Sequence, residues 1–189
     1  MIKLYLVRHG RCDWNGGGDF KIGKVIGDID RPITSYGIYQ AQKVALSFSE
    51  GQIKINKAYS SPLSRAKETA ETIKLVLSHF GQDFRIVETE EFKERNHGVT
   101  QGIDRIMAAD YEKINSSYDG KFPNGESLRD LESRVKPKLI EILEKDVGNI
   151  LIVSHNDVMR FMHRILTDCK EEETALKYFK QGQFYEYIK

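Results

Sequence analysis

The sequence contains few of the features that mark special classes of protein. Only two cysteines occur among its 189 residues, Cys12 and Cys169. They are too few and too far apart for a disulfide framework or a cysteine-ligated metal site, so we expect a reducing compartment. No apolar run approaches the length of a membrane span, and the N-terminus lacks the charged and apolar regions of a signal peptide. We therefore expect a cytoplasmic protein without a membrane partner.

The chain also lacks an excess of charge of either sign. It carries 29 Lys and Arg against 28 Asp and Glu, a formal net charge of +1. This balance excludes the strong basic excess typical of nucleic-acid-binding proteins, so we expect no nucleic-acid partner. The apolar content of 40% is ordinary for a globular protein, and the length suits one domain. We predict a single domain over residues 1–189, either a monomer or a dimer.

Short apolar runs alternate with segments whose apolar residues have helical spacing. The predicted strands are 2–7, 57–60, 84–89, 149–153 and 184–188, with the last one at a sheet edge. Helices are expected from 34 or 35 to 51, over 61–80, 103–117 and 126–146, and again after 156. The alternation predicts an α/β fold, a three-layer αβα sandwich around a mostly parallel sheet. Loop and helix insertions at about 92–125 are expected to form a small cap.

Chemically capable side chains stand where the buried strands end. Arg8 and His9 follow the first strand, His155 follows the fourth, and Arg65 lies in the first turn of the helix after the second. Parallel strands present their carboxyl ends at one edge of the sheet, so we expect these four side chains to converge there. Two cations and two imidazoles suit a phosphoryl group, and Glu94 on a nearby loop suits a proton donor.

A metal site formed by His9, His155 and Glu94 is the main alternative from the residues alone. The arginines beside the histidines would repel a cation, which disfavours this alternative. We therefore expect a site for a small phosphorylated substrate, with no metal and no other cofactor.

Motifs spread in order over nearly the whole chain resemble those of the histidine phosphatase superfamily, the phosphoglycerate mutase-like group. They are Arg8-His9-Gly10, Trp14-Asn15, residues 30–37 with Gln40-Ala41, residues 60–66 with Thr69-Ala70, Glu94 to Gly98 with Gln101-Gly102, residues 123–127, and Val153-Ser154-His155.

The resemblance implies a phosphoglycerate mutase-like fold and a covalent mechanism. His9 would attack phosphorus, while its other ring nitrogen would donate a hydrogen bond to a backbone carbonyl. Arg8, Arg65 and His155 would hold the phosphoryl oxygens. Glu94 would protonate the leaving oxygen and later activate water, and for this we expect burial to raise its pKa.

The resemblance also assigns further substrate contacts and shows departures from the family pattern. Asn15 would donate another hydrogen bond to phosphate, and we count Asn156 and Arg95 among the phosphate- or substrate-binding residues. Asn156 stands where glycine is usual, and Arg11-Cys12 stands where Glu-Thr is usual. For Arg95 a solvated surface position is the alternative; for Cys12 we favour a small apolar substitute over a redox-sensitive thiol.

Within the superfamily, hydrolysis and phosphoryl transfer between sugar-acid positions are both open. The loop from Glu94 to Gly102 is mutase-like, but the segment from Ile103 to Phe122 is short, as in the broad-specificity phosphatases. We therefore predict a phosphomonoester hydrolase that uses a phosphohistidine intermediate. A cofactor-dependent mutase is the alternative. A non-catalytic phosphate-binding member is less favoured, because the chain keeps the predicted catalytic residues.

Overall fold

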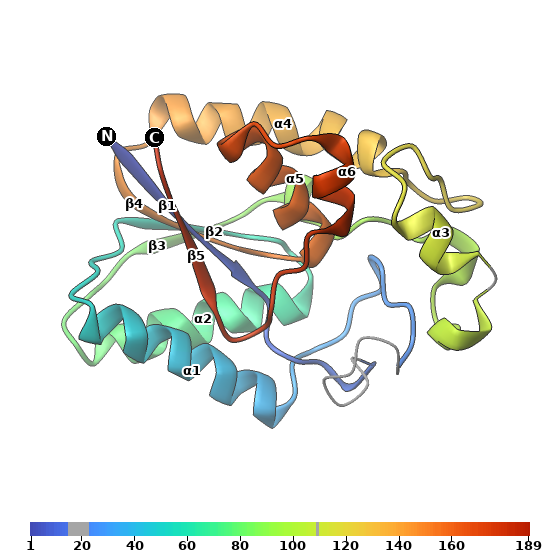
Figure 1. Ribbon diagram of the computed structural model, residues 1–189. Helices are drawn as coiled ribbons and strands as arrows, with labels where there is room; N and C mark the ends of the chain where they lie inside the picture. The colour runs from blue at the N-terminus through green and yellow to red at the C-terminus, as the bar shows by residue number, and fades with distance from the viewer. Residues whose placement is uncertain (15–22, 109) are drawn as a thin grey trace.

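The computed structural model describes residues 1–14, 23–108 and 110–189, and its centre is a five-stranded sheet (Figure 1). The strands are β1 (Ile2–Arg8), β2 (Lys57–Ser60), β3 (Arg85–Glu88), β4 (Gly148–Ser154) and β5 (Phe184–Ile188). Their order is β3-β2-β4-β1-β5. The first four strands run parallel, and β5 is antiparallel at the edge beside β1. The mostly parallel sheet and its C-terminal edge strand are confirmed.

Helices cover both faces of this sheet. The helices α1 (Ser35–Glu50) and α2 (Ser64–Ser78) lie on one face, and α4 (Leu128–Lys145), α5 (Asn156–Thr167) and α6 (Glu171–Leu176) lie on the other (Figure 1). The predicted three-layer sandwich is therefore confirmed. In the described part of the chain, no helix is both long and apolar enough to cross a bilayer.

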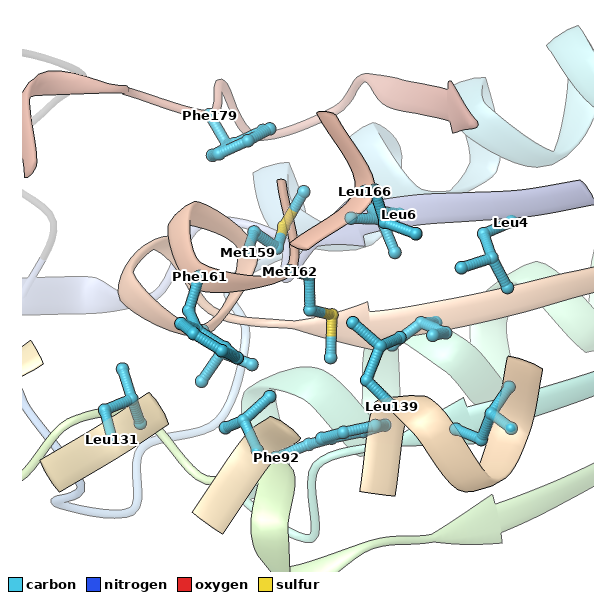
Figure 2. Close-up of a cluster of buried hydrophobic side chains, with 14 of the residues drawn as sticks. Leu4, Leu6, Phe92, Leu131, Leu139, Met159, Phe161, Met162, Leu166 and Phe179 are labelled. Atoms are coloured by element: carbon cyan, nitrogen blue, oxygen red, sulfur yellow. The ribbon is translucent and has the colours of Figure 1, made fainter. Parts of the chain in front are cut away.

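The central strands are apolar on both faces because both faces are covered. In β1, Leu4 and Leu6 join the core under α4 and α5, whereas Tyr5 and Val7 join the core under α1 and α2. Successive side chains of a strand point to opposite faces, so a strand packed on both sides needs a continuous apolar run. Figure 2 shows the first of these cores, where Leu4 and Leu6 lie near the methionines of α5.

Two helix starts follow the expected capping chemistry. The Thr34 hydroxyl accepts a hydrogen bond from the Gly37 amide at the start of α1. At the start of α4, Ser127 and Asp130 form a reciprocal capping box. Each satisfies amides that the first helical turn leaves without partners. These starts set the entry angle of each helix after its loop.

The predicted helix over 103–117 is wrong. The structure has a 3-10 turn at Arg105–Met107 and then the short α3 at Tyr111–Asn115. Asp110 adopts a left-handed backbone conformation with φ of 55°, which interrupts a right-handed helix. The apolar pattern was misleading, because Ile106 and Met107 are 81% and 73% exposed rather than buried.

The remainder of the 92–125 segment is compact loop. It includes 3-10 turns at Glu90–Phe92 and Gly98–Thr100. The Val99 amide donates to the Pro123 carbonyl at 3.1 Å, so the two sides of the segment are bonded to each other. Gly98 has φ of +54°, and a Cβ there would lie 1.9 Å from the same carbonyl oxygen. This close approach requires glycine. The segment lies beyond the carboxyl ends of the parallel strands, beside the site described next (Figure 1).

Candidate active site

Two histidines meet at the carboxyl edge of the sheet. The register pairs Arg8 of β1 with Ser154 of β4, so His9 and His155 leave adjacent strands at the same level. Their ring centroids are 5.1 Å apart, and both side chains are buried. The structure therefore confirms that His9 and His155, at the ends of β1 and β4, lie close together.

A pocket that is partly open to solvent lies at this point. Its walls are formed by strand-end residues, by the loop that carries Glu94, by the 26–27 loop and by the 92–125 segment. They are Arg8, His9, Ile26, Gly27, Arg65, Glu94, His97, Arg105, Tyr111, Asn115, Asn156 and Asp157. His155, whose ring centroid lies 5.1 Å from that of His9, is not part of the wall itself.

The tautomer of His9 follows from its hydrogen bond. Its Nδ1 lies 2.7 Å from the Gly10 carbonyl oxygen. A carbonyl only accepts, so Nδ1 carries the proton and Nε2 has a free lone pair. Burial first, and then the positive charges of Arg65 and Arg8, hold the pKa of His9 well below its usual value. The imidazole is therefore neutral at physiological pH, as nucleophilic attack requires.

The Gly10 carbonyl is itself held in place. The Gly10 amide donates to Thr69 Oγ1 at 2.9 Å. A Cβ on Gly10 would lie 2.5 Å from the Gly37 carbonyl oxygen, so α1 packs directly against this backbone. Glycine at position 10 therefore allows α1 to pack closely against this backbone. This packing fixes the Gly10 carbonyl that accepts the hydrogen bond from His9 Nδ1.

Arg65 is oriented by backbone carbonyls of the preceding loop. Its two terminal nitrogens donate to the carbonyls of Ile29 at 2.7 Å and Gly27 at 2.6 Å. The side chain is 1% exposed, yet its Nε is buried without a partner among the described residues. The guanidinium is thus fixed at the pocket wall with donor capacity remaining.

Arg8 is fixed by the C-terminal part of the chain. Its Nη1 donates to the Phe179 carbonyl at 2.9 Å, and the ring of Tyr178 lies 5.1 Å from its guanidinium carbon. The amide of the same Phe179 donates to Asn156 Oδ1 at 3.0 Å. Asn156 also donates from Nδ2 to Asp157 Oδ1 at 3.2 Å. Asn156 lines the pocket. However, its side-chain amide is hydrogen-bonded to Asp157 and to Phe179, the residue whose carbonyl holds Arg8.

Glu94 has the raised pKa that an acid catalyst needs. Burial, and then the negative charge of Asp157, raise its pKa to about 7. The Arg95 amide donates to Glu94 Oε1 at 2.9 Å and opposes this shift in part, as do Arg65 and Arg8. The direction that we expected from burial is confirmed, and Asp157 is an additional cause.

A buried charge cluster beside the pocket was missed in the sequence. Asp157 forms ion pairs with Arg95 at 2.9 Å and with Arg160 at 3.0 Å, and His97 Nε2 lies 3.4 Å from its carboxylate. Burial alone would raise the pKa of Asp157, but the two guanidinium groups outweigh burial and hold that pKa well below its usual value. The available signal was an acid and an arginine three residues apart at the start of an apolar helix.

This cluster changes the interpretation of Arg95. The side chain is 0% exposed, is paired with Asp157, also bonds Asn115 and lies against the ring of Phe122. It is not part of the pocket wall, so the structure does not bring it to the substrate position that we expected. The surface alternative is wrong too, because the ion pair with Asp157 stabilises a fully buried guanidinium.

The 92–125 segment supplies walls that the sequence did not indicate. His97 stacks on Phe122 with ring centroids 4.6 Å apart, and the Tyr111 hydroxyl lies 3.4 Å from His97 Nδ1. Burial is the largest of the effects that lower the pKa of His97 to about 4. His97 is thus a neutral packing residue at the pocket wall. Arg105 and Asn115 line the pocket from the same segment.

The remaining predicted residues have simple outcomes. Asn15 lies outside the described residues. Cys12 is 0% exposed, and burial raises the pKa of its thiol, as suits the small apolar substitute that we favoured. Within the described ranges, no three His, Cys, Asp or Glu side chains form a group that could hold a metal ion.

The chain is thus an αβα sandwich around a mostly parallel sheet, with two buried histidines and two buried arginines where its parallel strands end. The family model of the histidine phosphatase superfamily (branch 1) matches residues 4–183, and the chain belongs to this superfamily.

Known relatives carry the names of both mutases and phosphatases. The chain is 34% identical over 179 residues to a 2,3-bisphosphoglycerate-dependent phosphoglycerate mutase from Rhizobium etli (strain CIAT 652), a match that covers 89% of this chain and 81% of the relative. It resembles a structure of a putative alpha-ribazole-5'-P phosphatase from Escherichia coli K-12 with a TM-score of 0.77 and 25% identity, over 98% and 89% of the two chains. Bacillus stearothermophilus YhfR has a TM-score of 0.80 at 23% identity, over 98% and 90%.

Proposed function

We propose that the protein is a phosphomonoester hydrolase that forms a phosphohistidine on His9. The observation that carries this proposal is a set of buried donors around one pocket. Arg8 Nε, Arg65 Nε and His155 Nδ1 are buried and have no hydrogen-bond partner in the described part of the chain. Unpaired buried donors are costly, and a phosphoryl group offers the oxygen acceptors that would satisfy them.

The protonation of His155 fits this arrangement. Its Nε2 lies 2.8 Å from Ser61 Oγ, which also accepts from the Leu63 amide. The hydroxyl is thus set to donate to Nε2, which leaves the proton on Nδ1 as a donor to phosphate. Burial and the neighbouring Arg65 hold the pKa of His155 well below its usual value, so it acts as a neutral donor.

The first chemical step transfers the phosphoryl group to the protein. The lone pair of His9 Nε2 attacks phosphorus, and the bond to the leaving oxygen breaks. Glu94, half protonated near neutral pH, gives its proton to that oxygen. Arg8, Arg65 and His155 stabilise the charge on the three remaining oxygens.

The second step returns the enzyme to its starting state. The Glu94 carboxylate takes a proton from water as the water oxygen attacks phosphorus. The bond to Nε2 breaks, its electrons return to the imidazole, and inorganic phosphate leaves. Asn15 would add a hydrogen bond to the phosphoryl group in both steps.

The choice of water over a second sugar-acid oxygen as acceptor rests on the short 92–125 segment. This segment supplies one arginine, Arg105, to the pocket wall. Its other arginine, Arg95, forms an ion pair with Asp157 instead. A phosphoglycerate mutase must hold a carboxylate in addition to the phosphoryl group, which needs further cations. Phosphoryl transfer of the mutase type remains the second candidate because of the named relatives.

Two measurements test the proposal. Brief reaction with a ³²P-labelled monoester should leave acid-labile label on the protein, and His9→Ala should abolish both label and turnover. His79→Ala is the matched control, because His79 is an exposed helix-end histidine. Phosphate release from p-nitrophenyl phosphate is then compared with 3-phosphoglycerate isomerisation in the presence of bisphosphoglycerate. Strong isomerisation with negligible phosphate release would show a mutase instead.

A further inference from the structure

A second groove adjoins the phosphoryl pocket. It is lined by Glu112, Asn115 and Ser116 on the side of α3, and by Arg160, Ala175, Leu176 and Tyr178 on the side of α6. Asn115 lines both the pocket and the groove, so the two spaces share a wall. The phosphoryl pocket and the groove therefore border the same side chain.

The α6 side of this groove exposes apolar side chains. Leu176 is 71% exposed and Tyr178 is 42% exposed, while neighbouring Ala175 is buried and anchors the helix in the core. A single exposed leucine is ordinary, but here an exposed leucine and an aromatic ring line the same groove. An apolar group placed between them would remove their surface from water.

A residue of the groove, Tyr178, also contacts Arg8 of the phosphoryl pocket. The Tyr178 ring lies 5.1 Å from the guanidinium carbon of Arg8, which lines the phosphoryl pocket. A phosphoryl oxygen bound by this guanidinium is therefore close to the aromatic ring.

The charges around the groove disfavour an anionic leaving group. The groove's cation, Arg160, is 4% exposed, is paired with Asp157 at 3.0 Å and also donates to the Lys177 carbonyl. Glu112 contributes a negative charge. A carboxylate or second phosphate would meet repulsion there without a new ion pair, whereas a neutral apolar group would gain contacts.

We propose that this groove is the leaving-group subsite, and that it selects monoesters of neutral, apolar alcohols or phenols. The inference rests on the proposed hydrolase function and narrows its substrate class. Leu176 and Tyr178 act in it as specificity residues and take no part in the chemical steps.

The test compares two alkyl monoesters of similar leaving-group chemistry, hexyl phosphate and glycerol 1-phosphate. We expect kcat/KM to be about tenfold higher for hexyl phosphate, the effect of removing a few CH₂ groups from water. Leu176→Asp should abolish that preference, and Leu176→Ala should reduce the preference in part. Leu75→Asp is the matched control, because Leu75 is 62% exposed on α2, in the layer on the other face of the sheet.

The outcomes separate this proposal from the function on which it rests. If wild-type protein hydrolyses both esters equally, or if Leu176→Asp lowers kcat/KM for both by one factor, the subsite assignment is wrong and the hydrolase assignment stands. A preference for glycerol 1-phosphate would likewise overturn the subsite. If neither ester nor p-nitrophenyl phosphate releases phosphate, the hydrolase proposal itself fails.

Discussion

Replacement of Glu94 by glutamine should remove acid catalysis selectively from substrates with poor leaving groups. Glutamine keeps the size of the side chain but has no proton to transfer. For an alkyl phosphate we expect kcat/KM to fall by about 10²–10³, within the range usual for one general acid. For p-nitrophenyl phosphate we expect a fall of less than about tenfold, because nitrophenolate leaves without a proton.

The raised pKa of Glu94 sets the pH dependence of the same reaction. With a pKa of about 7, half of the Glu94 side chains are protonated at that pH and about one tenth are protonated one unit higher. Alkyl phosphates are already dianionic there, since their second pKa is about 6. The wild-type kcat/KM should therefore decrease about tenfold per pH unit above about pH 7. Glu94→Gln should lack this decrease.

Initial rates of hexyl and p-nitrophenyl phosphate hydrolysis between about pH 5 and 9 test both statements. The appropriate quantity is kcat/KM, which reports transfer to His9, because Glu94 also acts as base in the second step and its loss would lower kcat for every substrate. Glu91→Gln, an exposed carboxylate of the same loop, is the control. Equal losses for the two esters, or a decrease above about pH 7 that persists in Glu94→Gln, would refute the assignment of Glu94 as the acid.

Three further predictions concern stability and positioning. Since the folded-state pKa of Glu94 exceeds the unfolded value of 4.5, the wild-type chain loses stability as pH rises from there through about 7. Glu94→Gln should therefore be about 3 kcal/mol more stable than wild type in urea unfolding at about pH 8, and equally stable at about pH 4. Asn156→Gly should release the backbone that holds Arg8 and weaken inhibition by inorganic phosphate about tenfold, and an unchanged inhibition constant would contradict this role. Gly98→Ala should destabilise the protein by about 1–3 kcal/mol more than Gly81→Ala, because both glycines have positive φ but a Cβ at Gly81 meets nothing within 4 Å; equal unfolding midpoints would contradict the clash.

The strands and their terminal residues could be predicted because their determinants are local. The apolar runs at β1 and β4 need no knowledge of their partners, since a strand covered on both faces must be apolar throughout. Once the sheet is parallel, topology alone brings His9 and His155 to one edge. A bond from the second ring nitrogen of His9 to a backbone carbonyl was also predictable, because the nucleophile must present an unprotonated nitrogen; only the structure identifies that carbonyl as the one of Gly10.

The residues that the sequence did not indicate depend on contacts between distant segments. Arg95 and Arg160 are 65 positions apart, and only the fold shows that both pair with Asp157. The break at Asp110 depends on a backbone conformation, and the apolar residues before it imitate a helix that does not form. Asn156 was assigned to phosphate because of its position after His155, but the nearby Phe179 amide takes its oxygen.

The place of β1 in the sheet has a consequence for how the protein is made. β1 lies between β4 and β5, whose residues are added to the chain about 150 and 180 positions after it. The nascent chain therefore carries an apolar strand that cannot be paired until most of the protein has left the ribosome. Such long-range pairing slows folding and prolongs exposure to aggregation. Because Arg8 donates to the Phe179 carbonyl, we expect the arginine of the pocket to be fixed late, when the segment before β5 packs against β1.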